Sequence, residues 1–104
     1  MPNYLLIYHG GKTPESPEEG AEAMAAWGRW YEELGAATVE AGNPVMKSHT
    51  VSAEAVREDG GSNPASGYTI LAADSHAAAC EMAARNPIVL DGSGSVEVAE
   101  IHEI

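Results

Sequence analysis

The sequence predicts an α+β fold, in which two helices alternate with the strands of an antiparallel sheet. One helix begins at residues 16–19, where Ser, Pro, Glu and Glu form a capping box in the expected order. Residues 4–8 and 67–72 are short runs rich in apolar and aromatic side chains, which is typical of strands. Helical and extended segments therefore alternate along one short chain.

The large apolar side chains of the first helix fall on one face. They are spaced by three, four and three: Met24, Trp27, Tyr31 and Leu34. This spacing predicts an apolar stripe that faces the core. Trp30 lies about 60° from the centre of the stripe by helical geometry, so we expect it at a pocket rim or an interface.

Local signals predict the remaining elements. Glycine, asparagine and proline at residues 42–44 interrupt a strand, and proline there is typical of a kink or a sheet edge. Asp74 or Ser75 caps a second helix, which ends at Asn86 before a proline. In chain order we expect extended segments at residues 4–8, 38–41, 49–56, 67–72 and 96–101, helices at 17–34 and up to about 85, and a loop at 59–64.

The order of these elements predicts a ferredoxin-like βαββαβ subunit, with one antiparallel sheet and both helices on one of its faces. The other face then carries apolar side chains without cover. Five apolar strand residues cannot all point at the helices: Leu5, Ile7, Leu71, Val96 and Val98. Because an exposed apolar face usually marks a partner surface, we expect a homodimer that packs two such sheets face to face.

Length and charge narrow the class of protein. The chain has 104 residues, of which 44% are apolar, so we expect residues 1–104 to form a single domain. Its formal net charge of −11 argues against nucleic acid and against an anionic membrane surface as partners, since both favour basic proteins. The acidic charge otherwise aids solubility.

Cysteine and histidine usage gives no signal for a metal site, and we expect no cofactor. The one cysteine, Cys80, excludes an intrachain disulfide, and its alanine-rich surroundings favour a buried structural thiol. The four histidines show no metal-ligand spacing such as HExxH. Without a signal peptide or an apolar run of about 20 residues, a cytoplasmic location is expected.

Four short segments occur in a characteristic order along the chain. They are Tyr4-Leu5-Leu6-Ile7-Tyr8, Ala41-Gly42-Asn43-Pro44, Gly67-Tyr68-Thr69-Ile70 and Gly94-Ser95-Val96-Glu97-Val98. Together they resemble the YCII-related family of small dimeric α+β-barrel proteins, which includes the DGPF-type members. The resemblance spans nearly the whole chain and implies a ferredoxin-like subunit in a homodimer. Some members are linked to dehydrochlorination of chlorinated hydroquinone-type aromatics, for which a histidine–aspartate pair is implicated.

The chain departs from that family pattern at two places. The family's implicated histidine lies on the first helix, where the nearest positions here are Ala23 and Met24. The DGPF motif is reduced to Asp59 and Gly60, followed by glycine and serine. The resemblance therefore carries over no catalytic residue.

His9 is the residue that we favour for catalysis. It ends the first strand and precedes two glycines, and catalytic groups often lie where a rigid strand enters a flexible loop. Imidazole is also the side chain best suited to proton transfer near neutral pH. The alternative is a partly exposed residue at the end of a strand, with the glycines there only for the turn.

A ligand pocket is expected between the first helix and the sheet. Met24, Trp27 and Trp30 would line it, although ordinary core packing explains them as well. Asn43 and Tyr68 lie near strand ends, where they would orient a substrate or else satisfy backbone groups at the kink. We expect a YCII-like protein that binds a small, partly apolar or aromatic molecule. It is either a cofactor-independent acid–base lyase or isomerase, or a non-catalytic dimeric binding module.

Overall fold

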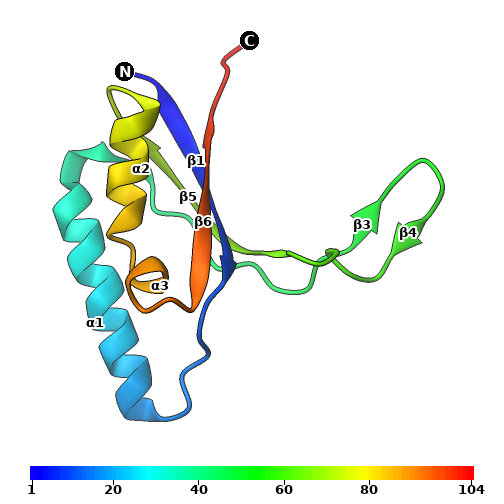
Figure 1. Cartoon of the computed structure of the whole chain (residues 1–104), viewed down its shortest axis with the longest axis horizontal. Helices are drawn as coiled ribbons and strands as arrows, with labels where there is room; N and C mark the ends of the chain where they lie inside the picture. Colours follow the sequence, from blue (N-terminus) through cyan, green and yellow to red (C-terminus); the bar gives the residue numbers. More distant parts are fainter.

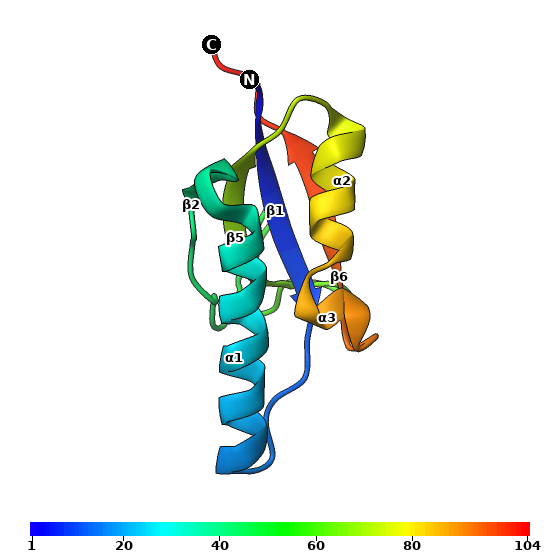
Figure 2. The ribbon, with the colours of Figure 1, turned by 90° about the vertical axis from the view of Figure 1, so that its left-hand side faces the viewer.

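The computed structural model describes all of residues 1–104 and has the predicted α+β architecture (Figure 1). Its antiparallel main sheet has the strand order β2-β5-β1-β6. These strands are β1 (Asn3–Gly10), β2 (Thr38–Glu40), β5 (Ala65–Ala72) and β6 (Gly94–Glu100). The helices α1 (Pro17–Leu34) and α2 (His76–Ala84) lie on the same face of the sheet (Figure 2). The ferredoxin-like fold is therefore confirmed.

The start and the end of α1 follow from local chemistry. The Ser16 hydroxyl accepts a hydrogen bond from the backbone N–H of Glu19 at 3.1 Å, which satisfies one of the free N–H groups of the first turn. The Glu19 carboxylate in turn accepts from the backbone N–H of Glu15 at 2.8 Å. Gly35 follows the helix with a φ of 52°, a left-handed angle that favours glycine, and opens the short 3-10 helix η1 (Gly35–Ala37).

A third helix, α3 (Pro87–Leu90), was not predicted. The side chain of Asn86 is fully buried and caps it, because its carbonyl oxygen accepts from the backbone N–H of Ile88 at 3.0 Å. Pro87 ends α2 as expected, but proline is also tolerated in the first turn of a helix, so it starts α3. This single turn supplies one wall of the cleft described below.

The sheet has a covered face and an open face. Tyr4, Leu6 and Tyr8 on β1 point under the helices and are buried. The open face carries the alternate β1 residues Leu5, Ile7 and His9 and their partners on the neighbouring strands, which are Ile70 and Tyr68 on β5 and Ala99, Glu97 and Ser95 on β6. As predicted, apolar side chains occupy both faces. Of the five named from the sequence, Leu5 and Ile7 lie on the open face, and Leu71, Val96 and Val98 belong to the core on the covered face.

Residues 45–64 form an arm that projects from the sheet on the side away from the helices (Figure 1). The predicted extended segment 49–56 is a hairpin within this arm, in which β3 (Thr50–Val51) pairs with β4 (Val56–Arg57) outside the main sheet. The arm gives the chain a radius of gyration of 14.8 Å, against about 13 Å for a compact chain of this length. Its exposed large apolar residues are Val45, Met46, Val51 and Val56.

The sequence-based expectations for Met24 and Cys80 are wrong. Met24, expected on the buried stripe, is 78% exposed. Trp30, expected at a pocket rim or an interface, is only 2% exposed and lines the cleft described below. The buried face of α1 is turned toward Trp30 because α2 lies on that side and offers the Met82 carbonyl to the indole N–H, at 2.9 Å. Cys80 is exposed rather than buried, since Ala79 and Ala83 are the α2 residues that reach the core.

Candidate functional site

Aromatic rings from α1 and β1 pack against one another under the first helix. The ring of Trp27 meets Tyr8 nearly edge to face, at 5.1 Å between centroids and 85°, and meets Trp30 at 5.8 Å and 89°. Such edge-to-face pairs are favourable beyond the area that they bury. Because Trp30 is also held by its hydrogen bond to Met82, the half-buried Trp27 rests on a fixed support.

A chain of hydroxyl groups lies behind these rings. Thr69, fully buried on β5, donates to the carbonyl oxygen of Ala41 at 2.8 Å, so the Tyr8 hydroxyl is the donor in its 2.5 Å contact with the Thr69 oxygen. Tyr31 donates to the same Ala41 carbonyl at 3.0 Å. Burial raises the pKa of Tyr8 well above its ordinary value, so this phenol stays neutral and serves the packing.

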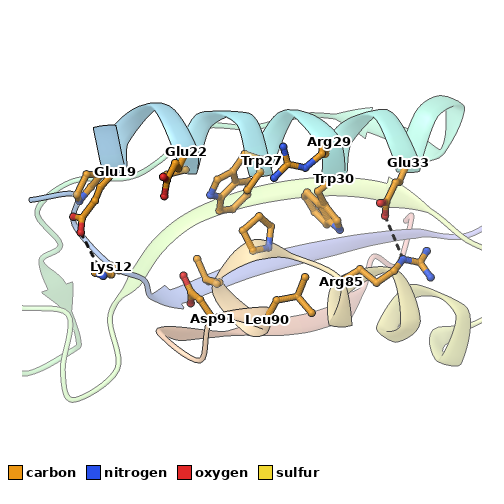
Figure 3. Close-up of a pocket in the computed structure, with 15 residues that line it drawn as sticks. Lys12, Glu19, Glu22, Trp27, Arg29, Trp30, Glu33, Arg85, Leu90 and Asp91 are labelled. Carbon is orange, nitrogen blue, oxygen red and sulfur yellow. Dashed lines mark ion pairs between the residues drawn. The ribbon is translucent and has the colours of Figure 1, made fainter. Parts of the chain in front are cut away.

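The exposed side of Trp27 lines a cleft of about 500 Å³ between α1 and α3 (Figure 3). Ala23 and Ala26, two small residues one turn apart on α1, leave the space that the cleft occupies. The opposite wall comes from α3 and includes Pro87 and Leu90. A volume of this size is within the range of about 300–1,000 Å³ that holds small molecules in proteins.

Ion pairs stand at the two ends of the cleft (Figure 3). Lys12 meets Glu19 at 4.0 Å at one end, and Arg85 of the α2 C-cap meets Glu33 at 3.6 Å at the other. These pairs are exposed and add little stability. Three of the five basic residues of this acidic chain nevertheless line the cleft, with Arg29 as the third.

Charged groups along the cleft differ in how they are engaged. Hydrogen bonds from Ser93 lower the pKa of Asp91, and the charge of Lys12 also favours the ionised form. Glu22 and Arg29 have neither an ion pair nor a side-chain hydrogen bond, although both line the cleft. The Glu22 carboxylate points from α1 toward the cleft, beside Trp27 (Figure 3). It is the one carboxylate of the cleft that has no ion pair or hydrogen bond within the chain.

His9 does not line this cleft, because its side chain is on the open face of the sheet. Both of its ring nitrogens already have protein partners: Nδ1 lies 3.2 Å from the Pro64 carbonyl oxygen, and Nε2 lies 3.1 Å from the Glu97 carboxylate. The structure therefore separates His9 from Trp27 and Trp30 by the thickness of the sheet.

The other residues proposed from the sequence are also spread over the molecule. Tyr68 points to the open face, and its backbone N–H donates to the Asn43 carbonyl at 3.2 Å, so these two residues are neighbours through their backbones. Gly42 permits this approach, since its φ is 79° and a Cβ there would overlap the Tyr68 carbonyl. Trp27 and Trp30 line the cleft, whereas Met24 does not.

Several cleft residues were missed from the sequence. Ala23 and Ala26 carry no chemical signal of their own, and the wall at Pro87 and Leu90 depends on the short helix that was not predicted. The one available signal was that Ala23 and Ala26 lie one helical turn apart, next to Trp27 and Trp30. Small side chains beside large rings indicate space for a ligand.

The structure contains no group of three or more histidine, cysteine, aspartate or glutamate side chains arranged to hold a metal ion. None of its helices is both long enough and apolar enough to span a bilayer.

These observations define a ferredoxin-like α+β subunit with a cleft on the helical side of its sheet. A solved structure of similar fold is 5-chloro-2-hydroxyhydroquinone dehydrochlorinase (TftG) from Burkholderia phenoliruptrix AC1100, in complex with 2,5-dihydroxybenzoquinone. The match covers 96% of this chain and 95% of that chain, with a TM-score of 0.56 and 17% identity. At this identity the likeness shows the fold alone. No protein-family model and no curated protein sequence matches the chain.

Proposed function

We propose that this protein binds a small, partly aromatic molecule in the cleft between α1 and α3. The observation that carries this proposal is the placement of Trp27, whose ring is fixed from behind by Tyr8 and Trp30 and lines the cleft of about 500 Å³ in front. A rigid indole at the edge of a cavity offers a flat apolar surface to another ring without losing side-chain freedom on binding. The fold-level neighbour, which holds a quinone, supports a ring-shaped ligand by analogy.

The charged groups of the cleft favour acid–base chemistry if the bound molecule is converted. Glu22 lies beside Trp27 and has no partner within the chain, so it is free to accept a proton from a bound ring. Arg29, also unpaired, is available to stabilise negative charge that develops on the ring. A lyase or isomerase that needs no cofactor fits this pair, and a non-catalytic binding module is the alternative. Membership of the YCII-related family and a cytoplasmic location are part of the same proposal.

His9 as the proton-transfer group stays a prediction, and its position makes Glu22 the better candidate within the cleft. Asn43 and Tyr68 do not line the cleft either. His9 and Tyr68 would act on a ligand only at a second site, on the open face.

A homodimer is part of the proposed function. Leu5, Ile7 and Ile70 give the open face an apolar surface, and the arm projects on the same side of the sheet (Figure 1). A second copy that packs on this face would bury these side chains and would lie within reach of the arm and its exposed apolar residues.

Binding is tested with 2,5-dihydroxybenzoquinone and catechol as probes, by calorimetry and by quenching of tryptophan fluorescence. Ala26→Leu fills the space beside Trp27, so we expect at least a tenfold loss of affinity, since about 1.4 kcal/mol corresponds to a factor of ten. The matched control is Ala25→Leu, the same change at the neighbouring exposed position, which does not line the cleft and should leave binding unchanged.

The proposal fails if neither probe binds the folded protein, or if Ala26→Leu binds as tightly as the control. For a molecule that is converted, Glu22→Gln should keep the affinity and lose turnover, since the amide keeps the shape and removes the proton acceptor. If Glu22→Gln keeps its turnover and His9→Gln loses it, His9 rather than Glu22 is the proton-transfer group.

A further inference from the structure

His9 connects three parts of the molecule through its two ring nitrogens. Its ring belongs to β1, its Nδ1 lies 3.2 Å from the carbonyl oxygen of Pro64 at the base of the arm, and its Nε2 lies 3.1 Å from Glu97 on β6. The His9 side chain is only 11% exposed, so protein rather than water surrounds it. This arrangement is independent of the cleft, which lies beyond the covered face.

The partner atoms determine which form of the ring fits. A backbone carbonyl and a carboxylate can only accept hydrogen bonds, and a neutral imidazole has a single N–H to donate. Only the imidazolium form, with a proton on each nitrogen, donates to Pro64 and Glu97 at the same time. We propose that His9 is a protonated clasp that fixes the base of the arm to the sheet, and that it releases the arm when it loses a proton.

The two hydrogen bonds of the clasp differ in strength, and this difference determines which of them is lost on deprotonation. The carboxylate of Glu97 is the stronger acceptor, because hydrogen bonds to a charged group are stronger than those to a neutral one. A ring with one proton keeps it on Nε2 and turns the lone pair of Nδ1 toward the lone pairs of the Pro64 carbonyl. Deprotonation therefore loosens the arm and spares the contact within the sheet.

The charged group within ion-pair distance of His9 is Glu97, whose own side chain is 60% exposed. The partners of His9 across the sheet are Ala65 on β5 and Ser95 on β6, which are both uncharged. The register of β1 and β5 shifts between Tyr8 and His9, and this irregularity lies at the residue that follows Pro64. The strand thus changes register where the arm returns to the sheet, and the His9 ring bridges that point.

The arm has few other connections to the sheet. Its outgoing limb is joined to β5 by one backbone hydrogen bond, from Val45 to Ser66 at 3.0 Å, and β3 and β4 pair only with each other. Loss of the contact between His9 and Pro64 thus removes the side-chain hydrogen bond that holds the end of the arm at residue 64. The whole arm then becomes more mobile.

The test follows the arm by amide hydrogen exchange of the full-length protein from pH 5 to pH 9, as protection factors of residues 45–64. The protonation of the His9 ring nitrogens is recorded by nitrogen-15 NMR in the same samples. We expect both nitrogens to carry protons while the arm is protected, and protection to fall roughly tenfold as one proton leaves, as loss of a charge-assisted hydrogen bond implies.

His9→Gln should abolish this pH dependence, and His49→Gln should keep it, because His49 is an exposed histidine on the arm itself. Each protein is compared at two concentrations, which separates the arm from any change in association. A neutral His9 ring in the protected state would overturn the proposal even if His9→Gln fails to fold, and so would protection of the wild-type arm that does not change with pH.

Discussion

Leu5 and Leu6 are neighbours on the central strand, yet they belong to different environments. Leu6 is fully buried under the helices, whereas Leu5 is half-buried on the open face. The covered face is closed by helices and a layer of aromatic rings, and the hydroxyl groups of Tyr8 and Thr69 are hydrogen-bonded to each other there. The open face has similar apolar side chains and no cover from its own chain. The covered face therefore stabilises the subunit, and the open face is available for association.

The largest expected effect is a difference in stability between alanine variants of these neighbouring leucines. Leu6→Ala leaves a cavity in the core, and we expect it to lower the free energy of unfolding by about 2–5 kcal/mol. Leu5→Ala is the same change on the open face and should cost the monomer much less. Urea denaturation at a concentration that favours the monomer measures both. Equal losses would show that the two faces do not differ in this way.

The next effect concerns association. Ile70→Lys places a charge on the open face, so we expect the mass in solution to fall from twice the 10.8 kDa chain to that of one chain, with the fold kept. Light scattering and circular dichroism measure this. Met24→Lys, the same kind of change at an exposed apolar residue on the helical side, should leave the mass unchanged. A wild-type protein with the mass of one chain would remove the proposed dimer.

A smaller effect appears at alkaline pH and belongs to the covered face. The pKa of Tyr8 is raised by burial in the folded state, so the neutral phenol contributes stability that is complete below about pH 10, the ordinary value, and is lost as pH rises above it. Tyr8→Phe should lose some stability at pH 7 with its hydrogen bond, but should decline less between pH 10 and pH 11.

Thr69→Val provides the contrast for this prediction. Burial is the main cause of the raised Tyr8 pKa, and Thr69→Val leaves the phenol buried. The valine variant should therefore retain most of the alkaline loss of stability. Identical alkaline curves for Tyr8→Phe and Thr69→Val would contradict the assignment to Tyr8.

Much of the fold could be predicted from the sequence because its signals are local. The cap at Ser16, the glycine after α1 and the break at residues 42–44 each act within a few residues. Successive side chains of a strand point to opposite faces of the sheet. The continuous apolar run of β1 was therefore enough to predict apolar side chains on both faces. The order of the elements then fixed the topology, since few arrangements of these elements pack well.

The candidate site could not be predicted in the same way, because it depends on contacts between distant segments. The sequence does not determine whether the buried face of α1 is centred on Trp27 or is turned toward Trp30. The hydrogen bond from Trp30 to the Met82 carbonyl, 52 positions away, decides this. The partners of His9 lie 55 and 88 positions away, so its engagement was not visible from its neighbours in sequence.

Both tryptophans of the chain stand in the wall of one cleft, and this gives the protein an internal optical reporter. All of its indole emission originates within one helical turn, from two rings that are in edge-to-face contact. A ring that binds against Trp27, as proposed, should change this emission without an attached dye. Tryptophan fluorescence can therefore screen unlabelled metabolites for the proposed ligand.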